Sequence, residues 1–459
     1  MATLPPGREL RFDALPPAVA HVLARLTDAG YEAALVGGCV RDPLMGVVHE
    51  GDWDAATSAR PETVAELFPG ATWENRFGTV TVRDTPSVEV TSYRADEGYR
   101  DRRRPDEVRF GVALPDDLAR RDFTINAMAW LPTDLEAGLG LVVDPFGGEA
   151  DIGSRRLRTV GDPRQRFDED ALRLVRAARF AGRFELTIDP ATEAAIMAMA
   201  PLAASVSHER IRDELFRILE LSDMPSRTFL LMESLGLLGI LFPEVAALRG
   251  VPQRKARPGD ALDHTLAAVD AASGLELRLT ALLHDLGKAT TLADGHFIGH
   301  ERVGAELAGA LLARLRVPGQ LAGRVQAVIA HHMYDYGPDW TDAAVRRFIR
   351  RTDGVDCTLL FGLRRVDNVA SGVGPDAEEV QAELEARIAA ELSAQPELLV
   401  GRRLAIDGHD LQRELGLPAG PELGRVLDQL TEAVLDDPSL NRRDRLLAMA
   451  ERVVLGRTG

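Results

Sequence analysis

Cysteine, lysine and long apolar runs are scarce in this sequence. The two cysteines, Cys39 and Cys357, argue against a disulfide framework and predict a reducing compartment, the cytoplasm. No run of eighteen apolar residues occurs, so a membrane-spanning helix is not expected. The first residues lack a basic segment followed by an apolar one, so no secretory signal is predicted. These absences favour a soluble globular protein.

Basic residues are outnumbered by acidic ones. The 459 residues include 54 basic and 71 acidic side chains, and the net charge of −17 argues against binding nucleic acid through an overall positive field. Residues 94–183 are neutral, however, with 17 arginines and 17 acidic residues. The segments RDRRRP and LRLVRAARFAGRF can therefore form a locally basic face. Because Lys255 and Lys288 are the only lysines, coding bias is an alternative source of the arginines.

The length exceeds what one hydrophobic core usually holds, so several domains are expected. A helical pattern at 17–30 and the strand-like segments YEAALVGG and TVTVRDTPSVEVTSYR predict an α/β region up to about residue 150. From residue 168 the pattern is helical almost throughout. The predicted domains are an α/β head at 1–150, a helical neck and body at 151–250, a further helical domain at 255–375 and a helical tail at 376–459.

The segment LVGGCVRDPLMGVVHEGDWDAAT, residues 35–57, carries the first chemical motif. Asp52 and Asp54 are one residue apart, and on a strand such side chains project from the same face. They could hold two divalent cations about 3.5–4 Å apart, as in-line phosphoryl displacement requires. The glycine pair lets backbone N–H groups approach a triphosphate, and Glu89 in SVEVTSYR could be a third carboxylate. A solvated Asp-X-Asp turn is the alternative for this motif alone.

Further motifs give this segment a context. GGCVRDPLMG and DWDAAT resemble the first motif of class II tRNA nucleotidyltransferases, the CCA-adding enzymes of the polymerase-β superfamily. Four more stretches resemble that family's later motifs in the same order: RRDFTINAMAW (120–130), DPFGGEADI (144–152), EDALRLVRAARFAGRF (169–184) and SVSHERIRDELFRIL (205–219). The resemblance implies a head with a mixed β-sheet followed by helical neck, body and tail.

The resemblance also implies substrates and site residues. Asp52, Asp54 and Glu89 would be catalytic, with Mg²⁺ at the two aspartates activating the primer's 3′-hydroxyl and neutralising pyrophosphate. The substrates would be ATP, CTP and the 3′ end of tRNA. The residues expected to bind nucleotide are Gly37, Gly38, Arg41, Arg120, Arg121, Asp122, Asn126, Asp170, Arg173, Arg176 and Arg179.

The RRDFTINAMAW motif offers groups for the triphosphate and the ribose. Arg120 and Arg121 could reach triphosphate oxygens or ribose, and Asn126 offers its amide to a ribose hydroxyl. The alternative for both arginines is a salt bridge at a helix N-terminus with Asp117 or Asp122.

The motif Glu169-Asp170-x-x-Arg173 suggests how bases could be selected without a template. Asp170 and Arg173 are three residues apart and are expected on one helix face. A carboxylate only accepts hydrogen bonds and a guanidinium only donates them, and this pair complements the Watson–Crick edges of cytosine and adenine but not those of uracil and guanine. The alternative is a surface salt bridge worth about 0.2–0.5 kcal/mol.

Residues 94–110, RADEGYRDRRRPDEVRF, lie where the resemblance places a mobile loop that helps the site change from C to A addition. Related enzymes that add only CC have a shortened loop there. The segment looks full length in this chain, which favours complete CCA addition or A-only addition.

A second group of chemical residues lies in 261–372. Six of the ten histidines fall between 264 and 332, and the adjacent His-Asp of ALLHDLGKAT resembles the motif of HD-superfamily phosphohydrolases. Such ligands suit Mg²⁺, Mn²⁺, Ni²⁺ or Fe, whereas isolated histidines are usually structural. The expected metal ligands are His264, His284, Asp285, His300, His331, His332 and Asp367.

Three functions follow from these patterns. The leading prediction is template-independent addition of CMP and AMP from CTP and ATP to the tRNA 3′ end. An A-only enzyme working with a separate CC-adding enzyme is the alternative within that class. An HD-type phosphohydrolase that uses its N-terminal half to bind RNA is the alternative from another class, and the intact Asp52, Asp54, Asp170 and Arg173 argue against it.

Overall fold

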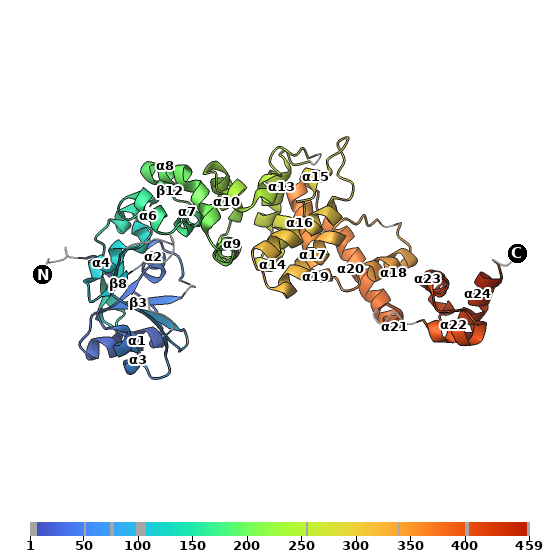
Figure 1. Ribbon diagram of the computed structural model, residues 1–459, viewed down its shortest axis with the longest axis horizontal. Helices are drawn as coiled ribbons and strands as arrows, with labels where there is room; N and C mark the ends of the chain where they lie inside the picture. Colours follow the sequence, from blue (N-terminus) through green and yellow to red (C-terminus); the bar gives the residue numbers. More distant parts are fainter. Residues whose placement is uncertain are drawn as a thin grey trace. The chain divides into compact units, whose positions relative to one another are not determined.

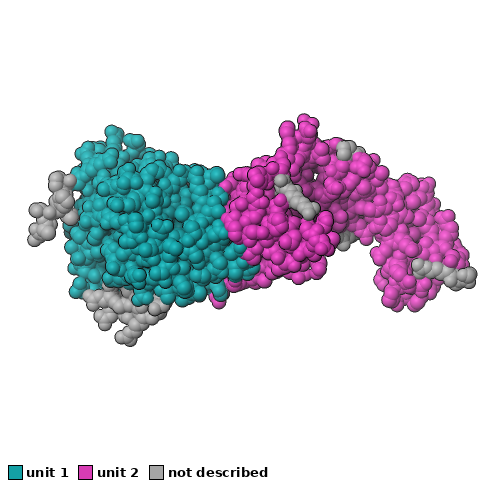
Figure 2. Space-filling view, turned by 90° about the horizontal axis from the view of Figure 1, so that it is seen from above, with its two compact units in different colours: residues 1–246 teal, residues 247–459 magenta. Residues whose placement is uncertain are grey.

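The computed structural model describes residues 7–49, 52–73, 78–97, 107–253, 256–337, 339–399 and 404–456. The chain divides into two compact units, residues 1–246 and residues 247–459, which Figure 2 colours separately. Among the described residues, no helix has both the length and the apolar composition needed to cross a membrane. The finer division into four domains stays a prediction.

The first unit begins with a mixed eight-stranded sheet, so the predicted fold class is confirmed (Figure 1). The strand order is β1-β10-β9-β2-β3-β6-β5-β4, and within it β3 and β6 pair in parallel while the other neighbours are antiparallel. The strands are β1 (Glu9–Arg11), β2 (Ala33–Val36), β3 (Trp53–Thr57), β4 (Thr72–Trp73), β5 (Thr79–Val82), β6 (Val88–Ser92), β9 (Ala129–Asp134) and β10 (Leu139–Val143).

Both faces of the central strands are buried, and side-chain alternation divides them between two cores. Leu35 and Ala55 join the core under helix α1 (Pro17–Asp28), which follows the predicted helical pattern and ends just before Gly30. Val36 and Ala56 join a second core with helix α4 (Leu114–Ala119) on the opposite face. By the same alternation, Asp54 projects to the α4 face. The remaining helices of this region are α2 (Gly38–Leu44), α3 (Pro61–Leu67), η1 (Thr124–Asn126) and α5 (Gly148–Gly153).

The segment predicted to be a mobile loop is described only at its ends. These ends form the antiparallel pair β7 (Arg94–Glu97) and β8 (Glu107–Phe110). Residues 98–106 lie outside the described residues, so the expectation based on loop length stays untested.

Helices follow the sheet in the first unit, as the sequence predicts. Helix α7 packs against α9 and α10, and an added Cβ at Gly182 would lie 2.2 Å from Thr228 Oγ1, so glycine permits the close approach of α7 and α10. The elements are β11 (Arg156–Leu157), α6 (Pro163–Glu169), α7 (Leu172–Phe184), β12 (Thr187–Ile188), α8 (Pro190–Met199), η2 (Ala200–Ser205), α9 (His208–Leu221), α10 (Pro225–Ser234), α11 (Leu238–Leu241) and α12 (Pro243–Ala246).

The described part of the second unit consists of helices and connecting loops. Its C-terminal helices are anchored by the buried Arg346, which donates hydrogen bonds to the carbonyl oxygens of Leu435 and Asp436 and to the carboxylate of Glu391. The helices are α13 (Ala261–Ala271), α14 (Leu275–Leu283), α15 (Lys288–Thr291), α16 (His300–Arg314), α17 (Gly319–His331), α18 (Asp342–Arg351), α19 (Cys357–Ser371), α20 (Asp376–Ala394), α21 (Pro396–Leu399), α22 (Gly408–Leu415), α23 (Pro421–Asp436), η3 (Pro438–Leu440) and α24 (Arg443–Leu455).

Candidate functional site

A cavity of about 550 Å³ in the first unit brings together residues from the sheet, from η1 and from helices α7 and α9. Every head and neck residue that the sequence singled out as catalytic or nucleotide-binding lines it. Sequence reasoning missed six further lining residues, which are Asp42, His49, Phe180, Arg183, Arg217 and Leu221. The predicted residues therefore share one site, whatever their individual roles.

Carboxylates occupy one side of this cavity, which we call the head cavity. Asp52 directly precedes β3, Asp54 lies on β3, and Glu89 lies opposite Asp54 on the parallel strand β6. Burial raises the pKa of Asp54, and the nearby charge of Asp52 raises it further, against the opposing effect of Arg121. A divalent cation would remove this penalty, and hard carboxylate oxygens suit Mg²⁺. The chemistry of these residues therefore fits a divalent cation.

Gly37 has no side chain, which leaves space between the Asp54 carboxylate and the Arg121 guanidinium. It follows β2 directly, and its φ of +74° lies in the region that favours glycine. An added Cβ would lie 3.0 Å from Arg121 Nη1 and 3.4 Å from Asp54 Oδ2. The glycine therefore keeps the carboxylate and the guanidinium accessible to each other and to a ligand.

A buried hydrogen-bond network connects the head motif to the neck. Arg41 donates to Asp42 Oδ1 from Nε (2.8 Å) and Nη2 (2.5 Å), and to Asn126 Oδ1 from Nη1 (2.6 Å). Asn126 Nδ2 donates to Asp122 Oδ1 at 3.0 Å, and Asp122 Oδ2 accepts from Arg176 at 2.7 Å. Despite the burial of Asp122, Arg176 and Asn126 hold its pKa well below the usual range. Arg41 and Asp122 therefore orient the Asn126 amide, which uses one of its two N–H donors within the protein.

Arg120 and Arg121 form the salt bridges that the sequence offered as an alternative, but at a different helix end. Arg120 donates to Asp117 Oδ1 from Nε (3.0 Å) and Nη2 (2.8 Å), and Arg121 Nη2 lies 3.7 Å from Asp117 Oδ2. The arginines follow the C-terminus of α4, not a helix N-terminus. Both also line the head cavity, so pairing with Asp117 positions them there.

The expectation that Asp170 and Arg173 share a helix face is wrong. Helix α6 ends at Glu169 and α7 begins at Leu172, and between them Asp170 has extended backbone with φ −151° and ψ 105°. The carboxylate of Asp170 accepts from Arg210 Nη1 (2.9 Å) and Nη2 (2.7 Å), and from the Leu172 N–H (3.1 Å). The long-range ion pair with α9 holds Asp170 outside the helix.

Arg173 is held by different partners. Its Nη1 donates to Glu169 Oε2 (2.7 Å) and to the Arg166 carbonyl (3.0 Å), and its Nη2 donates to the Arg120 carbonyl (2.9 Å). Asp170 is not among these partners, so the i, i+3 salt bridge weighed as the alternative is not what orients this guanidinium. Asp170 and Arg173 still line the same cavity, each with its own support.

The neck side of the head cavity is a wall of arginines assembled around one buried carboxylate. Glu214 is 1% exposed and accepts from Arg179 Nε (2.6 Å) and Arg217 Nη1 (3.2 Å), with Arg176 Nη1 at 3.7 Å. The guanidinium groups of Arg176 and Arg179 also lie over the ring of Phe180. Burial lowers the pKa of Arg179 to about 10, so it stays charged at neutral pH. This wall is suited to polyanionic ligands.

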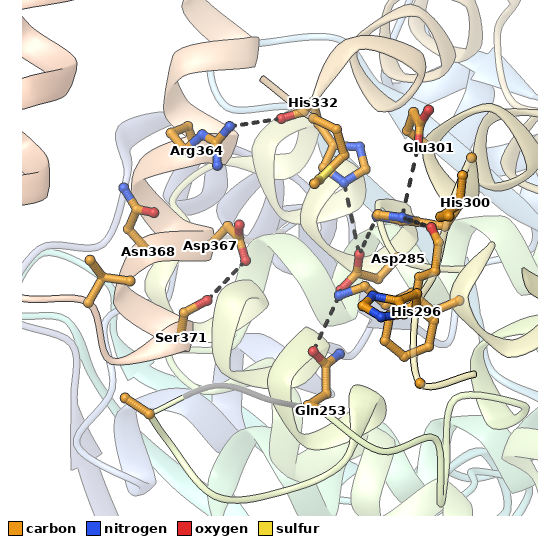
Figure 3. Close-up of a pocket in the computed structure, with 18 residues that line it drawn as sticks. Gln253, Asp285, His296, His300, Glu301, His332, Arg364, Asp367, Asn368 and Ser371 are labelled. Atoms are coloured by element: carbon orange, nitrogen blue, oxygen red, sulfur yellow. Dashed lines mark hydrogen bonds and ion pairs between the residues drawn. The ribbon is translucent and has the colours of Figure 1, made fainter. Parts of the chain in front are cut away.

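A second cavity, of about 840 Å³, lies within the second unit and is shown in Figure 3. Asp285 lies at its base, 3.6 Å from His300 Nε2 and 3.9 Å from His332 Nε2, and it accepts from Lys288 Nζ at 2.5 Å. An added Cβ at Gly287 would lie 2.1 Å from the His300 carbonyl oxygen, so glycine lets the start of α16 approach the His-Asp turn.

Six of the seven predicted metal ligands come together here, in what we call the HD cluster. Their ligand atoms form two groups, each with all its atoms within 4.8 Å: His264, His284 and Asp367, and Asp285, His300 and His332. His331 is the exception among the predicted ligands. It belongs to neither group, so the structure does not bring it together with the other predicted ligands.

The imidazole rings of the HD cluster are oriented by the backbone. His284, His300 and His332 each place Nδ1 2.7 Å from the carbonyl oxygen three residues earlier. Because a carbonyl only accepts, Nδ1 carries a hydrogen, so Nε2 is the nitrogen that a neutral ring can offer to a metal. Nε2 of His284 and of His300 is buried without a hydrogen-bond partner in the described structure. These nitrogen and carboxylate donors fit a divalent cation.

Burial also keeps two of these imidazoles neutral. It lowers the pKa of His332 to about 3, and it lowers the pKa of His300 below its ordinary value. For Asp285, burial acts the other way, but His284 and Lys288 hold its pKa well below the usual range. The neutral imidazoles of His300 and His332 beside the ionised carboxylate of Asp285 suit borderline metals such as Mn²⁺, Fe or Ni²⁺.

Comparison with known proteins agrees with both sites. Four family models match in order: the poly A polymerase head domain (33–158), the probable RNA and SrmB binding site of polymerase A (185–248), the HD domain (262–372) and the putative tRNA nucleotidyltransferase domain 2 (387–450). The sheet with its carboxylates and the HD cluster thus define a nucleotidyltransferase head joined to an HD domain.

Full-length relatives identify the family. The A-adding tRNA nucleotidyltransferase of Deinococcus radiodurans is 36% identical over 87% of this chain and 91% of its own length. The CCA-adding enzyme of a Geobacillus species is 32% identical over 93% and 94% of the two chains. The crystal structure of the Bacillus stearothermophilus CCA-adding enzyme in complex with CTP covers 97% of this chain and 99% of that chain, with 28% identity and a TM-score of 0.69. The chain belongs to the CCA-adding family of tRNA nucleotidyltransferases.

Proposed function

We propose that this protein adds CMP and AMP from CTP and ATP to the 3′ end of tRNA without a template. The observation that carries the proposal is the head cavity, in which Asp52, Asp54 and Glu89 face a wall of arginines. Relatives named CCA-adding enzymes, one of them solved with CTP, support the choice of substrates. The low cysteine content supports a cytoplasmic location.

In this proposal, the carboxylates and arginines divide the work of nucleotidyl transfer. The oxygen of the primer's 3′-hydroxyl loses its proton and bonds to the α-phosphorus, and the bond to the departing pyrophosphate breaks. Arg120, Arg121 and Arg176 bind the triphosphate and the negative charge that moves onto pyrophosphate. Asp52 and Asp54 would hold Mg²⁺, which supplies activation of the hydroxyl and charge neutralisation when bound.

Base selection is assigned to Asp170 and Arg173. A carboxylate has about four acceptor positions, of which Arg210 and the Leu172 N–H use three, and an exocyclic amino group can take the fourth. Arg173 directs three of its five N–H donors to protein oxygens and can direct others to a ring acceptor. The pair would then accept cytosine and adenine, although the two side chains are held independently.

The experiment that tests this function uses tRNA lacking CCA, tRNA ending in CC and complete tRNA, each incubated with labelled CTP, ATP, UTP or GTP. The expected result is CTP incorporation into tRNA lacking CCA, ATP incorporation into tRNA ending in CC, and nothing into complete tRNA. The Deinococcus relative favours the A-only alternative as second candidate, and that enzyme would leave tRNA lacking CCA unextended. No incorporation into any tRNA would overturn both.

A second activity is proposed for the HD cluster, namely metal-dependent hydrolysis of phosphate esters. The observation that favours it is the set of six buried or half-buried ligands beside a cavity containing Lys288 and Arg364, cations that can bind a phosphate. Purified protein should contain a divalent metal and release phosphate from a phosphomonoester or open a cyclic phosphodiester. Protein that contains the metal but hydrolyses neither a phosphomonoester nor a cyclic phosphodiester would contradict the proposed hydrolysis, but it would not contradict the metal site.

A further inference from the structure

Among the described residues that line the head cavity, His49 is the one histidine, and the sequence pattern assigned it no role. Its side chain is 7% exposed, and both ring nitrogens have partners. Nδ1 lies 2.9 Å from Asp42 Oδ2, and Nε2 lies 3.0 Å from the backbone carbonyl oxygen of Asp52. The ring also lies edge-on to Trp53, with the two ring centroids 5.1 Å apart. His49 thus touches both residues that flank the start of β3.

Both polar partners of His49 are hydrogen-bond acceptors. A carboxylate and a peptide carbonyl have no hydrogen to donate, so each contact requires a hydrogen on the facing ring nitrogen. With both nitrogens donating, the imidazole bridges the Asp42 carboxylate to the backbone of Asp52. A ring that only filled space would need neither contact.

The bridge attaches Asp52 to a rigid support. Asp42 and Arg41 are buried on α2 and joined by two hydrogen bonds. Arg41 also donates a hydrogen bond to Asn126, which in turn donates one to Asp122. Asp52 itself is exposed and lies just outside β3, so the sheet ladder does not hold its backbone as it holds Asp54. A carboxylate that has to hold a cation at a fixed distance from Asp54 needs such a constraint.

We propose that His49 is a positioning residue for nucleotidyl transfer, which fixes the backbone of Asp52 against the Asp42–Arg41 pair. The inference rests on the proposed role of Asp52 in the head cavity. His49 acts through Asp52 and not on the substrate, so its loss should slow the chemical step while nucleotide binding by the arginine wall continues.

The test compares His49→Ala, His49→Gln and His49→Asn in single-nucleotide addition, with ATP on tRNA ending in CC. His49→Ala should lower kcat about 10- to 100-fold, the cost of a hydrogen bond involving a charged group. The KM for ATP should change less than about threefold, and the Mg²⁺ concentration giving half-maximal rate should rise. Gln places its amide nitrogen near the position of Nε2 and Asn near that of Nδ1. His49→Gln should therefore recover more activity than His49→Asn, because the Asp52 contact is what matters.

His21→Ala on α1 is the matched control. His21 is exposed, lies far from His49 in the sequence and is not among the residues that line the head cavity. It should leave kcat unchanged. Wild-type kcat in His49→Ala, or equal rates for the Gln and Asn variants, would overturn the inference. If His49→Ala does not fold, the test depends on whether His49→Gln has a higher rate of addition than His49→Asn. Asp54→Asn distinguishes failure of the positioning role from failure of the proposed function. If Asp54→Asn is inactive while the His49 variants are fully active, the head cavity stays the catalytic site and only the positioning role of His49 is overturned.

Discussion

The head cavity and the HD cluster hold charge in opposite ways. In the head cavity, arginines and carboxylates neutralise one another, as in the pairs Asp170–Arg210 and Asp122–Arg176. In the HD cluster, imidazoles surround the ionised carboxylate of Asp285, and the rings of His284, His300 and His332 are each oriented by a backbone carbonyl. A ligand entering the head cavity meets existing ion pairs, whereas the HD cluster presents two groups of three ligand atoms, each group with its atoms within 4.8 Å of one another.

This contrast suggests different relationships to metal ions. Carboxylates beside arginines suit a cation that arrives with a triphosphate and leaves with pyrophosphate, because oxygen ligands bind Mg²⁺ without fully dehydrating it. Imidazole and carboxylate ligands at the HD cluster suit a cation that stays bound. Changes at one site should therefore leave the other intact, since they lie in separate compact units.

The largest effect is expected from Asp52→Asn or Asp54→Asn. Each removes a charge from the proposed cation site, and metal-based charge stabilisation is worth several kcal/mol, so addition should fall by about 1000-fold or more. Binding of tRNA, measured by gel shift or filter retention, should persist, and the metal content of the HD cluster should not change. Substantial addition by either variant at saturating Mg²⁺ would remove the basis for the head cavity as the catalytic site.

The double variant His284→Ala, Asp285→Ala tests whether nucleotide addition continues when the HD cluster is disrupted. Removing a ligand from each group should lower the affinity of the HD cluster for metal by more than about 100-fold and abolish any phosphohydrolase activity. Nucleotide addition should survive. Metal content by elemental analysis and addition rate are both measured, with His331→Ala as control.

His331 makes the control informative because it adjoins a ligand without being one. His331→Ala should keep the metal, since His331 belongs to neither group of ligands in the HD cluster. Loss of metal in this variant, or loss of addition in the folded double variant, would contradict the separation of the two sites.

A smaller effect is expected for base selection. Asp170→Ala removes the acceptor that repels the carbonyl groups of uracil and guanine, so the ratio of kcat/KM for CTP over UTP should fall about 10- to 100-fold. Arg173→Ala should weaken all nucleotides with a smaller loss of selectivity. An unchanged CTP/UTP ratio in folded Asp170→Ala would mean that Asp170 serves only to join α6 and α7 to α9.

The smallest effect should come from Arg210→Ala. Asp170 keeps its charge but loses the partner that orients it, which should cost about 1 kcal/mol and thus about fivefold in the same ratio. Arg212→Ala is the control, because Arg212 pairs with its neighbour Asp213 and is absent from the cavity lining. Equal ratios in the two variants would indicate that Asp170 does not need the clamp.

Much of the fold was predictable from local sequence, whereas most of the nucleotide-binding residues were predicted from the resemblance to a family. The continuous apolar run of β2 and the stop at Gly30 determine elements through short-range rules, and the spacing of Asp52 and Asp54 identified a carboxylate pair. The HD cluster was found because its ligands are unusual residues concentrated in one region.

The errors have three separate physical sources. EDALRLVRAARF has uninterrupted helical character, and the break at Asp170 coincides with an ion pair to Arg210, forty residues away. His331 and His332 are adjacent near a helix end, and about 100° of rotation separates their directions, so sequence could not say which faces the metal ligands. His49 was missed because a single histidine in a polar segment carries no periodic signal.

The carbonyl anchors of the HD cluster have a consequence for the entropy of metal binding. Each ring that donates Nδ1–H to its own helix or turn has lost its side-chain rotation when that segment folds, before any ion arrives. Immobilising a rotamer-rich side chain at the moment of binding costs about 0.5–1.5 kcal/mol. For His284, His300 and His332, this loss of entropy occurs during folding and not during metal binding. The affinity for the ion therefore depends on how well the helices α14, α16 and α17 are packed, so loosening their packing would release metal without touching a ligand.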